Sequence, residues 1–240
     1  MLRVRFMEEL VNLNHGMMAM GGLCEEVISL AGKAMITGDV SIAETVKPMI
    51  EEIDRKEKEI EDLCLRLLLE QQPVAGDLRK ISAALKMITD MQRIGDQAGD
   101  ILEITEYLSD SRKIPEGIKK PLQDKTDSES STADGENQVR IGSTHIRDMA
   151  VATIKMVNES VDAYVKQDTD IAKQVIDYDD VVDKLFTEVK SALIQLIIQH
   201  PEYGEYSMDL LMIAKYFERI GDHAVNIGRW VLFAVTGERE

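Results

Sequence analysis

Two copies of the tetrapeptide Arg-Ile-Gly-Asp mark the residues of this sequence whose types and spacing could do chemistry. Around the second copy, Glu218, Asp222 and Asn226 stand at every fourth position, so on a helix they form one polar row. The apolar residues between them predict that this row borders a buried stripe, where an unpaired charge is energetically expensive. We therefore expect a basic partner, a proton or a metal ion to neutralise the carboxylates.

A second pair of carboxylates could face this row from a neighbouring helix. Asp179 and Asp183 are one helical turn apart in the preceding apolar-periodic segment. Together with Glu218 and Asp222 they would offer oxygen ligands from two antiparallel helices to one or two divalent ions. No histidine or cysteine has matching spacing, and an all-oxygen set favours Mg²⁺, Ca²⁺, Mn²⁺ or iron over a structural zinc site. The sequence thus predicts a metal site in its C-terminal half.

The first copy of the motif has lost part of this ligand set. The two copies are separated by 126 residues, and Gln92 stands where Glu218 does. At an offset of 129, Ile50 stands where Asp179 does. The carboxylates that remain in the first copy are Asp54, Asp96 and Asp100. With fewer anionic ligands, a site here is expected to bind a metal ion more weakly.

The same residues could instead be ordinary ion pairs on helix surfaces, where charges contribute little. Arg219 lies three residues before Asp222 and could pair with it. The motif glycines argue for more than that, because Gly95 and Gly221 stand inside helical patterns, where glycine costs roughly 1 kcal/mol relative to alanine. Their repetition predicts close helix approach beside the aspartate. His223 points about a quarter-turn away and is expected beside the row or at the surface.

Apolar residues at three- and four-residue spacing predict six helices, at about residues 6–37, 41–71, 73–108, 143–166, 169–199 and 207–235. Gln167-Asp168 matches Gly38-Asp39 in position at a separation of 129, which marks the same turn in each half. Short connections within each half imply antiparallel neighbours. We expect an all-α chain of two repeated antiparallel three-helix bundles, with a first repeat at 1–109, an acidic flexible linker at 110–138 and a second repeat at 139–240.

Composition excludes several classes of function. A net charge of −16 argues against a nucleic-acid groove and against docking on anionic lipid, and suits divalent cations or a basic protein partner. No stretch approaches about 18 uncharged apolar residues, and acidic residues come too early for a signal peptide, so we expect neither a membrane span nor secretion. Two cysteines without a CxxC pair are typical of a reducing cytosol.

Further residues give the sequence a specific family likeness. The stretch Gln-Pro-Val-Ala-Gly-Asp-Leu-Arg at 72–79, the duplicated Arg-Ile-Gly-Asp and the Asp179…Asp183 pair resemble the PhoU family of bacterial phosphate-signalling regulators. The likeness spans both halves without the linker. It implies a cytoplasmic protein of two repeats and six helices, commonly a homodimer, that has no established catalytic activity.

The resemblance also implies partners and ligands. Members of the family work with the phosphate ABC transporter, through its ATPase subunit, and with a sensor histidine kinase, so that membrane contact occurs only through partners. They keep the phosphate-starvation response off when phosphate is plentiful. Some carry iron or zinc clusters on (Glu/Asp)xxxAsp rows, so Fe, Zn, Mn or Mg is expected here. The positions that match these rows are Asp179, Asp183, Glu218, Asp222, Asn226, Asp54, Asp96 and Asp100.

Two other functions stay open at the level of the sequence. One is an accessory regulator of a different phosphate transporter, which would share the fold but not the kinase partner. The other is a metal-dependent carboxylate enzyme built on a helical bundle. Sites of that enzyme class use Glu-x-x-His pairs, and the predicted metal rows contain none, which counts against it.

Overall fold

Six long helices and one short 3-10 helix make up the described part of the chain. The computed structural model describes residues 2–71, 73–109 and 134–238, and within these ranges it contains no strand. The helices are α1 (Leu2–Thr37), α2 (Ile42–Gln71), α3 (Ala75–Ser109), α4 (Asp134–Lys166), α5 (Thr169–Gln199), the 3-10 helix η2 (Pro201–Tyr203) and α6 (Gly204–Thr236). None of these helices is apolar over a stretch long enough to cross a membrane. The predicted all-α fold of six helices is confirmed.

The first turn of each repeat is built by residues that the duplication places in register. Gly38 ends α1 with a φ of 67°, and Gln167 ends α4 with a φ of 55° although it is not glycine. The aspartate that follows is the N-cap of α5 in the second repeat, whereas Asp39 lies three residues before the start of α2. Oδ1 of Asp39 and Oδ1 of Asp168 each accept a hydrogen bond from the backbone amide two residues on. The matched turns fold as the sequence comparison predicted.

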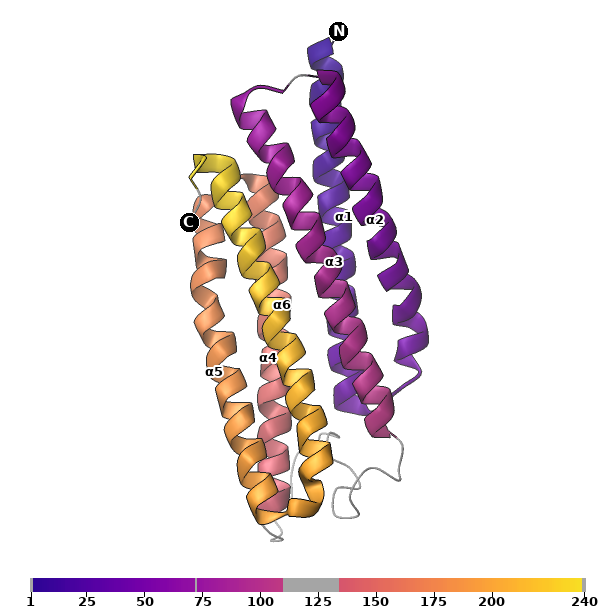
Figure 1. Ribbon diagram of the computed structural model, residues 1–240, viewed down its shortest axis with the longest axis vertical. Coiled ribbons are helices and arrows are strands. Elements are labelled where there is room, and N and C mark those ends of the chain that lie inside the picture. Colours follow the sequence, from indigo (N-terminus) through magenta and orange to yellow (C-terminus); the bar gives the residue numbers. More distant parts are fainter. Residues whose placement is uncertain (1, 72, 110–133, 239–240) are drawn as a thin grey trace.

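The two three-helix bundles pack against each other along their length. Helices α3 and α6 lie side by side through the middle of the molecule, α1 packs on α4 behind them, and α2 and α5 form opposite edges (Figure 1). Tyr107 of α3 bonds to Glu205 of α6 over 2.8 Å near one end, and Arg79 reaches the carbonyl of Ala234 over 3.5 Å near the other. Helices α3 and α6 are therefore antiparallel, and the second repeat is inverted relative to the first. We call the α3–α6 contact the repeat seam.

A single apolar core serves both repeats. Buried side chains from all six long helices belong to one continuous hydrophobic cluster. The contact between α1 and α4 is especially close, because a Cβ added at Gly21 would lie 2.9 Å from Cγ2 of Val161. The two bundles are therefore joined by packed apolar surface as well as by the polar bonds of the seam.

The starts of four helices differ by two residues or more from the predicted ones, and the first of these, α1, begins at Leu2 rather than near residue 6. Helix α4 begins at Asp134 rather than near residue 143, and α6 begins at Gly204 rather than near residue 207. Apolar spacing marks only where a helix covers a core, and a helix continues past that point through its backbone hydrogen bonds. The predicted linker at 110–138 therefore ends inside α4, and its residues 110–133 lie outside the described ranges. Pro73 precedes α3 instead of occupying its first turn.

Candidate functional site: carboxylate rows on paired helices

The carboxylates predicted for the second repeat lie on neighbouring helices. Asp179 and Asp183 belong to α5, and Glu218 and Asp222 belong to α6. The motif glycine lies where the two helices meet, because a Cβ added at Gly221 would be 3.6 Å from Oδ1 of Asp179. The repeated glycine thus marks helix contact beside this aspartate, as predicted.

Two carboxylates of the row, those of Asp179 and Asp222, have raised pKa values. Burial raises the pKa of Asp179 to about 6, and the neighbouring charges of Asp183, Asp222 and Glu218 add to this rise, while Arg229 only partly offsets it. Partial burial and the charge of Glu218 also raise the pKa of Asp222. Burial and nearby negative charges thus disfavour the ionised forms of these two residues. The arrangement therefore favours binding of a positive charge.

The row is less buried than the sequence predicted. Asp179 and Glu218 are half-buried, but Asp183 and Asp222 are exposed. The apolar positions beside them do form core, since Phe217 is completely buried. The row therefore lies at the edge of the core where it meets solvent. Asp183 and Asp222 thus lie on the solvent side of the buried stripe that the row borders.

One carboxylate of the row already has a counter-ion. Nζ of Lys215 contacts Oε2 of Glu218 on the same face of α6. The charge of Lys215 also opposes the rise in the pKa of Asp222. The same Nζ lies 5.6 Å from the ring centre of Phe186 on α5. Lys215 thus neutralises part of the row from within the protein, a role that its position in the sequence did not reveal.

Asn226 does not extend the row as predicted. Its Nδ2 donates to Oδ1 of Asp90 on α3 over 3.3 Å, across the repeat seam. Nδ1 of His223 lies 2.9 Å from the same oxygen. His223 is thus partly buried in the seam, beside the row and bonded away from it. No spacing pattern marks Asp90, since its two partners lie 133 and 136 residues further along the chain.

The first repeat has an amide where the second has a carboxylate. Nε2 of Gln92 donates to Oδ1 of Asp54 over 3.2 Å and to Oδ2 of Asp96 over 3.0 Å. NH1 of Arg93 adds a contact of 3.3 Å to the same oxygen of Asp96. The amide thus stands between two carboxylates and satisfies both. Asp54 and Asp96 are thus each hydrogen-bonded to a side chain of the protein itself.

Asp100 also turns away from its predicted role. Its carboxylate bonds to the hydroxyl of Tyr216 across the seam, and burial raises its pKa. At an offset of 126, Asp100 corresponds to Asn226 and Tyr216 corresponds to Asp90. The seam therefore carries the same bridge twice, once in each direction. Arg219, which could have paired with Asp222, lies 5.9 Å from the ring centre of Tyr216 instead.

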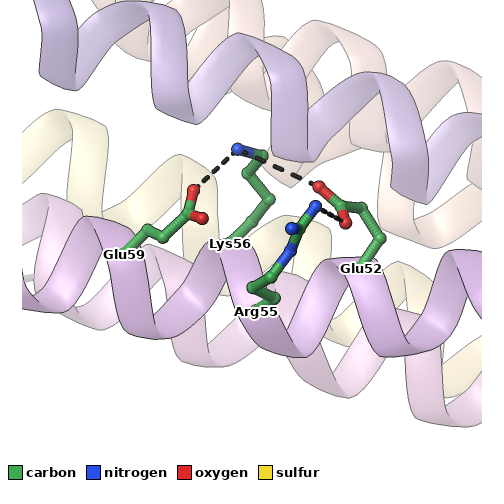
Figure 2. Close-up of polar contacts among 4 residues, drawn as sticks. All are labelled: Glu52, Arg55, Lys56 and Glu59. Atoms are coloured by element: carbon green, nitrogen blue, oxygen red, sulfur yellow. Dashed lines mark hydrogen bonds and ion pairs between the residues drawn. The ribbon is translucent and has the colours of Figure 1, made fainter.

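Ordinary surface ion pairs do occur on α2. Lys56 lies between Glu59, at 2.7 Å, and Glu52, at 3.9 Å, and Arg55 contacts Glu52 as well (Figure 2). All four residues belong to one helix, and such exposed pairs contribute little to stability. For this part of the first repeat, the interpretation as a solvated charged face is the better one.

A cleft lies beside the second-repeat row. Its volume is about 510 Å³, and it opens between α3, α5 and α6. Its lining is polar and carries charges of both signs, which suits small polar ligands. The residues that line it are Gln97, Asp179, Arg219, Asp222, His223, Val225, Asn226 and Arg229.

The two rows differ in how well they fit a metal ion. In the described part of the chain, no three carboxylate, histidine or cysteine side chains are grouped closely enough to hold one. The first repeat does not fit, because Gln92 already occupies the space between Asp54 and Asp96. The second repeat has suitable donor chemistry, with incompletely compensated oxygen ligands on two helices. Ion binding there would require its side chains, above all Glu218, to turn toward a common point.

Restoring the missing carboxylate in the first repeat tests this difference. We expect Gln92→Glu to lower the free energy of unfolding of the metal-stripped chain by roughly 1–2 kcal/mol, because two hydrogen bonds are replaced by repulsion among three carboxylates. Urea denaturation followed by circular dichroism measures the loss, and added Mn²⁺ should restore more stability to the variant than to the original chain. The exposed Gln174→Glu is the matched control. Unchanged stability of Gln92→Glu without metal would contradict the bridging role of the amide.

Comparison with known proteins agrees with this architecture. The family model described as "PhoU domain" matches residues 17–105 and 146–231, one match in each repeat. The "Phosphate-specific transport system accessory protein PhoU homolog" of Aquifex aeolicus is 30% identical over 216 residues, which cover 90% of this chain and 86% of the relative. The homolog of the same description from Pseudomonas aeruginosa is 29% identical over 233 residues, covering 97% of this chain and 86% of the relative.

Solved structures show the same fold. The crystal structure of PhoU from Pseudomonas aeruginosa superposes with a TM-score of 0.80 at 29% identity, covering 97% of this chain and 100% of that one. The phosphate transport system regulatory protein PhoU from Streptococcus pneumoniae gives a TM-score of 0.79 at 21% identity, covering 98% of this chain and 99% of that one, and supports the fold alone. With both repeats matched by the family model, the chain belongs to the PhoU family.

Proposed function

We propose that this protein is an accessory regulator of phosphate-specific transport that acts by binding rather than by catalysis. The observation that carries the proposal is the match of both repeats to the PhoU domain, together with relatives that are named as accessory proteins of the phosphate-specific transport system. The relatives align over most of their own length as well as over most of this chain. The proposal therefore concerns the whole chain and not one shared repeat.

In its finer form, the proposal makes the protein a negative regulator of the phosphate-starvation response. It would act in the cytoplasm, as a homodimer, between the ATPase subunit of a phosphate ABC transporter and a sensor histidine kinase. The net charge of −16 supports binding to basic surfaces on such partners. Association driven by complementary charge should weaken as salt concentration rises.

Complementation tests the regulatory role. The chain is expressed in a bacterium that lacks its own PhoU-family gene and carries a reporter for the phosphate-starvation response. We expect the reporter to stay off at high phosphate with this protein and to be active with an empty vector. A tagged copy should recover the transporter ATPase and the kinase from the same cells. A reporter that stays active despite normal protein levels, with neither partner recovered, would refute the proposal.

We further propose that the second-repeat row, formed by Asp179, Asp183, Glu218 and Asp222, binds a divalent cation. The raised pKa of Asp179 supports this, because burial and the neighbouring carboxylates disfavour its negative charge, and a bound cation would offset both effects. A bound cation would supply charge neutralisation at the junction of α5 and α6. The ion could be Fe, Zn, Mn or Mg, and the oxygen ligands suit Mn²⁺ and Mg²⁺ well.

Removing the charge of Asp179 should stabilise the metal-free protein. Its pKa is raised from 3.8 to about 6 in the folded chain, so stability falls as pH rises between these values and the penalty is fully present above pH 6. We expect Asp179→Asn to gain about 1 kcal/mol at pH 7.5, after allowance for solvent screening, and nothing at pH 4. Urea denaturation of metal-stripped protein at both pH values measures this, with the exposed Asp180→Asn as control. An equal gain at both pH values would contradict the electrostatic origin.

A further inference from the structure

An apolar stripe runs along the outer face of α1. Val4, Met7, Val11 and Met18 follow one another at helical spacing, and each is between 43% and 63% exposed. The other faces of α1 pack on α2, α3 and α4, and its N-terminal part projects past the upper ends of α4 and α6 (Figure 1). Single exposed apolar side chains are common on protein surfaces, whereas a contiguous stripe is typical of an interaction site.

The stripe overlaps the longest stretch of the sequence without a charged side chain. Residues 10–24 contain no Asp, Glu, Lys or Arg, although these types make up 30% of the chain. Burial accounts for only part of this stretch, because Asn12 and His15 are exposed as well as Val11 and Met18. A surface helix ordinarily carries charged side chains toward solvent, and depletion of charge is typical of the centre of a protein–protein interface.

Comparison of the two repeats shows that the fold itself does not require an uncharged outer face. At an offset of 129, the buried Met20 of α1 corresponds to the buried Met149 of α4. At the same offset, the exposed Met18 corresponds to Arg147. The core position is kept and the outer position is not. The apolar outer face is therefore a feature of α1 alone, and it serves something outside the bundle.

Gly22 lies on the same outer face, four residues after Met18. A Cβ added there would meet no atom of the described chain within 4 Å, so packing inside the protein does not call for glycine. Gly21 differs, because Val161 packs closely against it. Glycine inside a helix destabilises it relative to alanine. An exposed glycine at this position would let the backbone of a second helix approach closely.

We propose that this face of α1 binds the same face of a second copy of the chain, with the two α1 helices antiparallel. The inference rests on the homodimer of the proposed function and assigns its interface. Each copy carries a net charge of −16, so two copies repel one another wherever their acidic surfaces meet. The uncharged face allows contact without bringing carboxylates together. It can also pair with itself, as a two-fold symmetric dimer requires.

Charges at the two ends of the face favour the antiparallel orientation. Arg5 is exposed at the N-terminal end of the face, and Glu26 is exposed at its C-terminal end. In an antiparallel pair whose two-fold axis passes near His15, Arg5 of each copy lies beside Glu26 of the other. A parallel pair would instead place each of these residues beside its own equivalent, where like charges repel.

Sedimentation equilibrium of the full-length protein tests the proposal. We expect the original chain to form a dimer of twice 27.0 kDa. Met18→Arg introduces the residue that the second repeat has at this position, and should weaken the dimer at least about tenfold, because it places charges in an apolar contact. Ile198→Arg is the matched control. Ile198 is 67% exposed at the end of α5, outside the proposed interface, so this variant should dimerise as the original chain does.

Charge reversal tests the orientation. Arg5→Glu and Glu26→Arg should each weaken the dimer about threefold, because each places like charges side by side. The double variant restores the opposite pairing and should dimerise as the original chain does. Rescue of one reversal by the other within the same chain is expected only where the two α1 helices meet antiparallel.

Failure of the interface can be distinguished from failure of the proposed function. A monomeric original chain would overturn both the interface and the homodimer, whereas the regulatory role is measured separately by the reporter. A dimer that Met18→Arg leaves intact, or that Ile198→Arg weakens equally, would overturn the assignment to α1. Single reversals that the double variant does not rescue would overturn the antiparallel arrangement. Circular dichroism confirms that each variant is folded, and Val11→Arg replaces Met18→Arg if the latter is not.

Discussion

Replacement of Phe217 by alanine is expected to destabilise the entire chain by about 3–5 kcal/mol. The ring of Phe217 is 0% exposed and lies in the cluster that both repeats share. Its removal leaves a cavity at the centre of α6, next to the carboxylate row. Because the core is continuous, we expect the loss to appear in the unfolding of both repeats and not only in the second.

Two spectroscopic signals distinguish destabilisation of both repeats from destabilisation of the second repeat alone. Trp230 is the only tryptophan of the chain and lies on α6, so its fluorescence reports on the second repeat. Circular dichroism reports on the helices of both repeats. In urea, the two signals should shift together to lower denaturant concentration in Phe217→Ala. The exposed Met212→Ala on the same helix should change stability by less than about 0.5 kcal/mol. A first repeat that stays folded after fluorescence has changed would contradict the shared core.

Loss of the polar bridge through Asp90 should have the next largest effect. In Asp90→Ala, both Asn226 and His223 lose an acceptor in a partly buried seam, where the side chain of Asp90 is 15% exposed and that of His223 is 23% exposed. Leaving such groups unpaired costs about 1–3 kcal/mol. We expect that loss in the free energy of unfolding, and faster hydrogen exchange of amides in α3 and α6.

Two further variants separate hydrogen bonding from charge at this position. Asp90→Asn keeps an acceptor oxygen and should recover a large part of the lost stability. Tyr216→Phe removes the hydroxyl that bonds to Asp100 in the equivalent bridge, and should cost about 1 kcal/mol. Urea denaturation at constant pH measures the free energy of unfolding of Asp90→Ala, Asp90→Asn and Tyr216→Phe. If Asp90→Ala were as stable as the original chain, the bridge would be an incidental contact.

Features that depend on local spacing could be predicted from the sequence. The turns at Gly38 and Gln167 were indicated by an aspartate that follows each of them at the same offset, and their φ angles of 67° and 55° agree. The placement of Glu218 and Asp222 along one face follows from the helical period. Family membership followed from motifs that recur in both halves, and the family comparison confirmed it.

Features that depend on how the two repeats meet could not be predicted from the sequence. Asp90 has no local partner, and its bonds to His223 and Asn226 exist only because α3 and α6 are antiparallel neighbours. Apolar periodicity predicts which face of a helix is buried, but it does not say how far burial extends around that face. For this reason the exposure of Asp183 and Asp222 was missed. The role of Lys215 was missed because a lysine beside a carboxylate on a helix is ordinarily a surface pair.

The amide of Gln92 makes the two repeats differ in how they would respond to cations in solution. In the first repeat, Asp54 and Asp96 are bridged by a neutral side chain of the protein itself. In the second repeat, Glu218 takes the place of this amide, so the carboxylate row there can respond to cations in solution. Because the two repeats share one core, a rearrangement of the second-repeat row would be passed on to the packed helices of the first repeat.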